Sequence, residues 1–119
     1  MNFLKAGYHI FAYSLLVDER LMEDRCPYAI YAGRARLYDH RFVVNRHGVP
    51  TLQPAIGKMA FGVLWIVDSD ELCELDYFEG VDQFFTVRRK VNVVDESQSM
   101  VRAEAYIAKA SRAGLPKQD

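Results

Sequence analysis

Glu79 is the side chain whose position best suits acid–base chemistry. It stands near the end of a predicted short helix in residues 72–81 (LCELDYFEGV), four residues after Leu75 and therefore on the same apolar face. The helix dipole disfavours a negative charge in the last turn, and desolvation adds to this effect. Both effects raise the pKa of the carboxyl group towards neutrality, where it can serve as a general acid or base. The alternative is that the helix frays and Glu79 points into water, and the spacing alone favours this alternative.

The other reactive side chains form no pattern typical of a catalytic or metal site. Ser14 lacks the G-x-S-x-G setting of a nucleophile, and the chain has no glycine-rich phosphate loop. The two cysteines, Cys26 and Cys73, lack CxxC spacing and stand in helical contexts, which predicts buried, reduced thiols and a cytoplasmic protein. The histidines have no metal-ligand spacing: His9, His40 and His47. We therefore expect neither a metal nor a cofactor.

A capping signal and an apolar face predict the helix that carries Glu79. Asp68 is a candidate N-cap and Glu71 follows it by three residues, the spacing of a capping box. Gly80 can take the left-handed conformation that commonly ends a helix. An apolar residue recurs every third position on one face: Leu72, Leu75 and Phe78.

The N-terminal part predicts a strand that leads into a helix start. Residues 8–13 (YHIFAY) are aromatic and β-branched and predict a strand. Residues 19–25 predict a short helix, with Asp18 as its cap and Pro27 after its end. Backbone N–H groups at a helix start converge on anions and carbonyl oxygens, so residues 14–17 form a candidate binding loop.

The rest of the chain predicts mostly β-structure. Four more strands are expected over residues 30–38 (continued or bent over 40–44), 59–67, 84–94 and 101–108, the last two as a hairpin. The nearly all-apolar stretch 59–67 is expected to be buried on both faces. Residues 52–58 carry Pro54 and Gly57 and are expected to form a loop.

Composition indicates an ordinary globular domain. Half of the 119 residues are apolar, and 15 Lys and Arg balance 16 Asp and Glu. This balance attracts neither nucleic acid nor an anionic membrane, and Arg34 and Arg36 more commonly mark a solvated strand face. Arg88, Arg89 and Lys90 are likewise expected to form a solvated edge. No apolar run approaches the ~18 residues of a membrane span, and no signal-peptide pattern is present. We expect one domain over residues 1–119, loosely ordered from about 109, without a nucleic-acid or membrane partner.

Motifs from about Phe11 to Ile107 are shared with one family. They are Phe11-Ala12-Tyr13, then Met22, Arg25-Cys26-Pro27 and Ala29 at the family's distances, then Gly33, Ala35, Leu37, His40-Arg41-Phe42 and Asn45, then Gly62-Val63-Leu64-Trp65 and Leu75-Asp76-Tyr77-Phe78-Glu79-Gly80-Val81. On these motifs the chain resembles the gamma-glutamylcyclotransferase family, in its AIG2-like group. The paired GVLW and LDxxEGV segments are specific.

The resemblance implies an α+β fold, a single compact domain with a curved mixed β-sheet or partial barrel, short flanking helices and a site in the mouth. It implies that the alpha-amine of a gamma-glutamyl group attacks its own gamma-carbonyl, which releases 5-oxoproline and a free amine or amino acid without metal or cofactor. Glu79 corresponds to the family's catalytic acid/base. Substrate contacts are expected from Tyr13, Ser14, Leu15, Leu16, Val17, Phe85 and Thr86.

Three departures distinguish this chain from the family pattern. The family has Gly-Ser-Asn where this chain has Ser14-Leu15-Leu16. The family has a tyrosine shortly after EGV, whereas this neighbourhood contains Phe85 and Thr86. Family members usually continue beyond a GLP-like segment, so the expectation is a pocket wall that is either missing or supplied by a second subunit, as in a homodimer. Two hypotheses stay open: an enzyme whose substrate is less polar than glutathione-type gamma-glutamyl groups or is held differently, or a member without catalysis that binds a small molecule or a protein.

Overall fold

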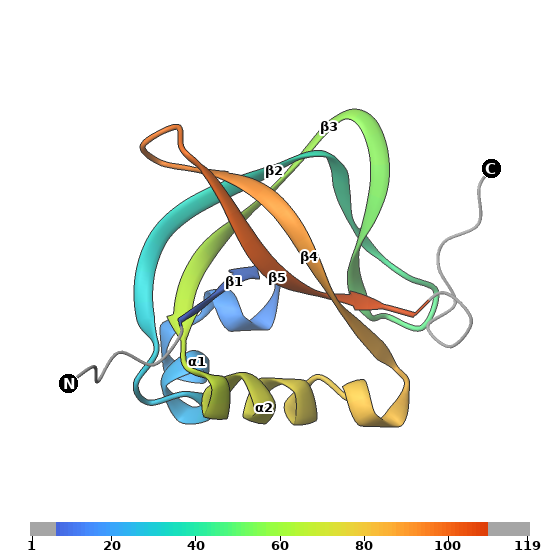
Figure 1. The fold of residues 1–119 in the computed structure, drawn as a ribbon. Coiled ribbons are helices and arrows are strands. Elements are labelled where there is room, and N and C mark those ends of the chain that lie inside the picture. The colour runs from blue at the N-terminus through green and yellow to red at the C-terminus, as the bar shows by residue number, and fades with distance from the viewer. Residues whose placement is uncertain (1–6, 110–119) are drawn as a thin grey trace.

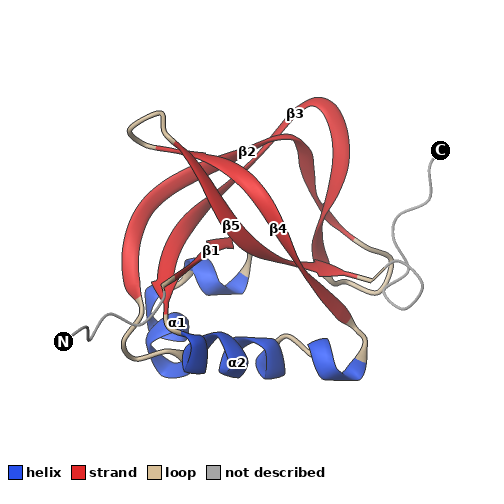
Figure 2. Cartoon of the chain, in the orientation of Figure 1, coloured by secondary structure: helices blue, strands red, loops and turns tan. Residues whose placement is uncertain are grey.

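The computed structural model describes residues 7–109, in which the strands close into a barrel and the helices gather on one side of it (Figure 1). The strands are β1 (Tyr8–Ala12), β2 (Ile30–Val44), β3 (Pro50–Val67), β4 (Thr86–Asp95) and β5 (Met100–Ala108). The helices are α1 (Glu19–Arg25) and α2 (Ser69–Phe78), with two 3-10 turns, η1 (Leu15–Val17) and η2 (Val81–Gln83). Figure 2 shows the helical segments together along one end of the barrel. The expected α+β fold, a curved mixed sheet with short flanking helices, is confirmed.

The strand order around the barrel is β1-β3-β2-β4-β5, and two short seams close it. Within the described residues, β1 meets β5 in parallel at Ile10 and Glu104. The second seam joins β2 to β4 over Ala35 and Arg36. The resemblance implied a partial barrel, and the observed barrel is closed but weakly joined at these two places.

Apolar side chains form two cores, one inside the barrel and one between the barrel and the helices. Side-chain alternation along β1 supplies both: Phe11 packs with Leu64 inside, whereas Ile10 packs with Leu75 of α2. All four are at most 1% exposed. Because each such burial contributes roughly 1.5–3 kcal/mol, β1 is held from both faces.

The predicted capping box at the start of α2 is confirmed. The Asp68 carboxylate accepts from the Glu71 N–H at 2.8 Å, and the Glu71 carboxylate accepts from the Asp68 N–H at 3.3 Å. Gly80 follows the helix at φ 77°, in the left-handed conformation that its lack of a Cβ permits. These local signals fix both ends of the helix and therefore the position of Glu79 between them.

The predicted loop over residues 52–58 is wrong, because β3 starts at Pro50 and includes these residues. Proline is tolerated in a strand where the ladder is interrupted. The β2–β3 register shifts directly after the pairing of His40 with Pro54, and the Asp39 backbone turns to φ 60° at this irregularity. The strand therefore accommodates Pro54 through a bulge.

Burial of residues 59–67 on both faces is also wrong. Phe61 is 66% exposed, whereas the neighbouring Ala60 is 2% exposed. The segment lies in an antiparallel ladder with one face turned outward, so its apolar composition does not imply two-sided burial.

Several smaller expectations are corrected. Cys26 is buried but Cys73 is exposed, and both are free thiols. The strand predicted to begin at residue 84 begins at Thr86. None of the helices in residues 7–109 combines the length and apolar character that crossing a membrane requires. The tail expected to be loosely ordered from about residue 109 falls almost entirely outside the described residues.

Candidate active site

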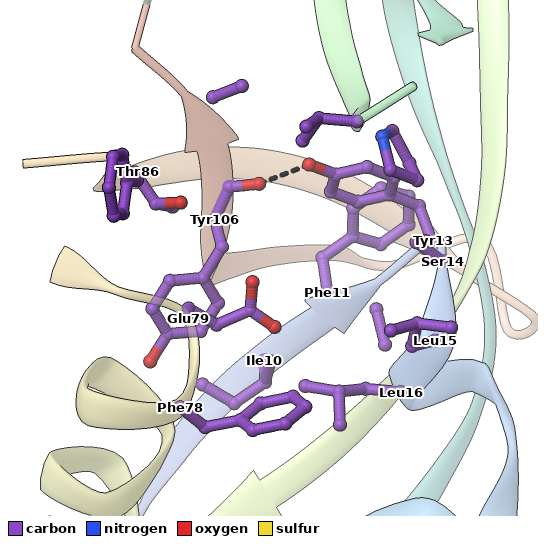
Figure 3. A pocket seen from close by; sticks show the side chains of 15 residues that line it. Ile10, Phe11, Tyr13, Ser14, Leu15, Leu16, Phe78, Glu79, Thr86 and Tyr106 are labelled. Carbon is purple, nitrogen blue, oxygen red and sulfur yellow. Dashed lines mark hydrogen bonds between the residues drawn. The ribbon is translucent and has the colours of Figure 1, made fainter. Parts of the chain in front are cut away.

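A cavity of about 370 Å³ lies where β1, η1, the end of α2, the starts of β3 and β4 and the end of β5 meet. Its size falls within the range of small-molecule sites. Figure 3 shows Glu79 on one side of the cavity and Leu15 and Leu16 on the other. Most of the wall is apolar, and Glu79 is its single carboxylate among the described lining residues.

The cavity brings together seven of the eight predicted site residues. Besides Glu79, four of them come from residues 13–16 and two from residues 85–86: Tyr13, Ser14, Leu15, Leu16, Phe85 and Thr86. Val17 does not line the cavity and is 42% exposed. The reason is local geometry, since η1 turns by about three residues per turn and directs Val17 away from Leu16.

Glu79 ends α2 with its side chain directed into the cavity (Figure 3). Its backbone N–H donates to the Leu75 carbonyl at 2.8 Å, so the last turn is intact and not frayed. Burial raises the pKa of the Glu79 carboxyl to about 7. At neutral pH the group is therefore present in both protonation states, which suits it to accept and return a proton.

We expect the Glu79 carboxyl to titrate near pH 7 instead of near its ordinary value of 4.5. The measurement is the pH dependence of the glutamate Cδ chemical shifts in a carbon-13-labelled protein. Loss of the corresponding signal in Glu79→Gln assigns the resonance. A midpoint below 5 would show that water reaches the carboxyl freely.

Tyr106 of β5 also lines the cavity beside Glu79, and sequence analysis missed it. Its phenol donates to Asp76 Oδ1 at 2.7 Å, and Arg88 Nε lies 2.9 Å from the same oxygen as an ion pair without hydrogen-bond geometry. Arg88 further donates to Glu104 at 3.0 Å, and Glu104 is 5% exposed. The predicted solvated edge at residues 88–90 is therefore wrong for Arg88, which belongs to a network that holds the Tyr106 ring.

The phenol rings of Tyr13 and Tyr106 thus line the cavity, although neither stands shortly after the EGV segment as the family's tyrosine does. The Tyr13 hydroxyl donates to the Tyr106 carbonyl oxygen (dashed line in Figure 3). Burial raises the pKa of both tyrosines, so both stay neutral at physiological pH. In the sequence, alternation along the strand places Tyr106 on the same face as Glu104. This alternation does not predict which element covers that face, so it does not predict that Tyr106 reaches the cavity.

Leu15 and Leu16 differ sharply in their surroundings. Leu15 is 63% exposed at the rim, whereas Leu16 is 4% exposed and belongs to the core beneath the helices. The Leu16 carbonyl accepts from the Trp65 indole N–H at 2.9 Å, which anchors the loop to β3. The first hydrogen bond of η1 runs from Val17 N–H to Ser14 O at 3.1 Å, so the amides of Leu15 and Leu16 precede it.

The arrangement can perform proton transfer in a mostly apolar pocket. It offers a carboxyl with a pKa near neutrality and two neutral phenols, and Leu15 and Leu16 of η1 form part of its wall. No group of three or more His, Cys, Asp or Glu side chains in residues 7–109 is placed to hold a metal ion. Such a site favours reactions in which the substrate carries its own nucleophile.

Comparison with known proteins identifies one family. The family model described as gamma-glutamyl cyclotransferase, AIG2-like, matches residues 10–119. No curated protein sequence gives a significant match.

Solved structures share the fold at low sequence identity. A gamma-glutamyl cyclotransferase superposes with a TM-score of 0.82 at 23% identity, over 87% of this chain and 68% of its own. An uncharacterized protein from Homo sapiens gives 0.80 at 24% identity, over 87% and 67%. An AIG2-like protein from Mus musculus gives 0.71 at 23% identity, over 94% and 86%. At these identities the likeness establishes the fold alone.

Proposed function

The chain belongs to the gamma-glutamyl cyclotransferase, AIG2-like family, and from this premise we propose that it is a cyclising enzyme that releases 5-oxoproline from a gamma-glutamyl amine or peptide. Glu79 acts as the acid/base. The observation that carries the proposal is the burial of this one carboxyl in a substrate-sized cavity with a pKa of about 7.

The proposed reaction needs one proton carrier. The Glu79 carboxylate takes a proton from the substrate's alpha-amine as the amine nitrogen attacks the gamma-carbonyl carbon. The protonated carboxyl then returns the proton to the leaving nitrogen, and the bond from that nitrogen to the carbonyl carbon breaks. General acid–base catalysis of this kind contributes about 10²–10⁴ in rate, and intramolecular attack needs mainly positioning. Amides at the start of η1 are available to steady the carbonyl oxygen.

The proposal is tested by incubating gamma-glutamyl amines and dipeptides with the wild-type protein and with Glu79→Gln. We expect 5-oxoproline and free amine in equal amounts with the wild type, detected by liquid chromatography and mass spectrometry. The variant is expected to match the buffer blank. Equal turnover by both proteins would remove Glu79 from the mechanism.

A second function is suggested by the exposed apolar side chains at the mouth. Leu15 is 63% exposed and Phe85 51%, and such exposed apolar side chains commonly mark a contact surface. A member without catalysis would bind a small molecule or a protein here, including a second copy of the chain. Sedimentation analysis of the wild type beside Leu15→Ser tests the second copy, since a dimer through the mouth would weaken in the variant.

We expect Ser14→Gly with Leu15→Ser to increase kcat/KM for ordinary gamma-glutamyl dipeptides about tenfold, because one regained hydrogen bond to a charged group is worth ~1.5–3 kcal/mol. Adding Leu16→Asn should cost roughly 2–5 kcal/mol of stability, since Leu16 is 4% exposed in the core. Kinetics and thermal melting of the double and triple variants separate the two effects. A folded double variant without any gain would show that the loop does not limit recognition.

A further inference from the structure

The cavity is better suited to a neutral acyl group than to a charged one. Leu15 and Leu16 face Glu79 across the cavity, and Phe78 and Phe85 form further parts of its wall. Burial among these side chains already disfavours the Glu79 carboxylate, as its raised pKa records. The described lining residues include no Lys, Arg or His.

A second negative charge would lie close to Glu79 in the proposed reaction. To take the proton, Glu79 must lie within hydrogen-bond reach of the substrate's alpha-amine. The alpha-carboxyl group is attached to the same carbon as that amine, so it lies on the order of 5 Å from Glu79. Two carboxylates this close in a poorly solvated site oppose each other's ionisation. An amidated alpha-carboxyl group avoids this opposition because it carries no charge.

We propose that the natural substrate carries an amide in place of the alpha-carboxylate, and that it is a peptide with an N-terminal glutamine. This inference rests on the proposed function, because it uses the same cavity and the same Glu79. The alpha-amine nitrogen bonds to the gamma-carbonyl carbon of the glutamine side chain. The bond from that carbon to the side-chain nitrogen breaks, and ammonia leaves with the proton that Glu79 returns. The product is a peptide with an N-terminal 5-oxoprolyl ring, and nothing is oxidised or reduced.

The shape of the site agrees with this substrate. The glutamine side chain lies in the interior beside Glu79, where the leaving ammonia is formed. The rest of the peptide leaves through the mouth, past Leu15 and Phe85, which are 63% and 51% exposed. These side chains favour an apolar residue directly after the glutamine.

The test compares three substrates on the full chain. They are gamma-glutamylbenzylamide with a free alpha-carboxylate, the same compound with an alpha-carboxamide, and glutaminyl-phenylalanine amide. Benzylamine, ammonia and the cyclic products are measured, with spontaneous cyclisation subtracted and Glu79→Gln as the control. We expect kcat/KM for the carboxamide to exceed that for the carboxylate by about tenfold or more, and Glu79-dependent ammonia release from the glutaminyl dipeptide.

Each other outcome is decisive. Turnover of the carboxylate at an equal or higher rate overturns this inference and leaves the proposed function standing. A carboxamide preference without cyclisation of the glutaminyl dipeptide overturns the assignment to N-terminal glutamine. No turnover of any of the three by the folded protein overturns both.

A substitution at the rim provides an independent check. Leu15→Arg adds a cation where the side chain is mostly exposed, and Leu15→Gln is a polar control without charge. We expect the arginine variant alone to reduce the carboxamide-to-carboxylate ratio of kcat/KM by about tenfold, because the new charge pairs with the carboxylate. An unchanged ratio in Leu15→Arg, with a melting temperature close to that of Leu15→Gln, would overturn the inference.

Discussion

Glu79→Gln is expected to lose activity and to gain stability above pH 7. The loss of the only proposed proton carrier should reduce kcat by about 10²–10⁴. The gain in stability has a separate cause, since burial raises the pKa of this carboxyl to about 7 from an ordinary 4.5. In the folded protein the wild-type carboxyl is therefore harder to ionise than in the unfolded chain, and its charge opposes folding.

The sign of the pH dependence follows from this difference. Below pH 4.5 the carboxyl is protonated in both states and the two proteins should be equally stable. Between pH 4.5 and about 7 the unfolded wild type has released this proton while the folded protein keeps it, so the wild type progressively loses stability relative to the variant, and the difference levels off above pH 7. The whole shift corresponds to ~3 kcal/mol, and partial solvation of Glu79 reduces the expected difference to about 2 kcal/mol.

Urea unfolding at about pH 4.5 and about pH 8.5 measures the effect. Glu74→Gln is the matched control, because Glu74 is an exposed glutamate on the same helix. The control should change neither the activity nor the pH dependence of the free energy of unfolding. A Glu79→Gln variant that is inactive but no more stable at the higher pH would mean that Glu79 is well solvated, and its role as a base with a raised pKa would then be lost.

The position of Glu79 was predictable because every signal for it is local. Asp68 and Glu71 cap the start of α2, and Gly80 ends it, within one stretch of the chain. Hydrogen bonds between near neighbours depend little on the rest of the fold. The raised pKa was one of two interpretations of the sequence, because the spacing alone favoured a frayed helix end with Glu79 in water.

The surroundings of Glu79 were only partly predictable. Tyr106 reaches the cavity because β5 lies beside β1, a seam that joins the strands over a single pair in the described residues. Neither strand carries a signal for this parallel contact, which joins segments far apart in the sequence. The link from Tyr106 through Asp76 to Arg88 likewise depends on how α2 lies against β4 and β5. Residues whose roles depend on tertiary contacts were therefore missed or assigned to solvent.

The candidate loop illustrates the same limit at shorter range. The change of Leu15 and Leu16 from the family pattern was visible in the sequence, but their exposure was not. A 3-10 turn places Leu15 at the rim and Leu16 in the core, and it directs Val17 away from the cavity. A polar side chain in place of the exposed Leu15 therefore costs little stability, whereas one in place of the buried Leu16 costs much more.

Gly62→Ala is expected to cause the largest loss of stability among single methyl additions in the barrel. Gly62 lies on β3 opposite Ala35, where β1 passes closely on the other side. An added Cβ would lie 2.3 Å from the Ala12 carbonyl oxygen and 2.8 Å from the Phe11 ring. Phe11 is 1% exposed and Ala12 belongs to the backbone ladder with Val63, so neither can move aside cheaply. We expect the free energy of unfolding to fall by about 3 kcal/mol or more.

Gly57→Ala is the matched control for this prediction. Gly57 has φ +81°, and a Cβ added there would meet no atom of residues 7–109 within 4 Å. Alanine at this position is therefore destabilising only through its unfavourable left-handed backbone conformation and not through a clash. The cost of that conformation is about 1–2 kcal/mol. Urea unfolding of both variants separates steric contact from backbone conformation, and equal losses would show that the close approach of β1 to β3 does not limit the barrel. If Gly62→Ala is the more damaging, the glycine of the GVLW segment is required because it lets β1 lie close enough to β3 to hold Phe11 and Tyr13 at the cavity wall.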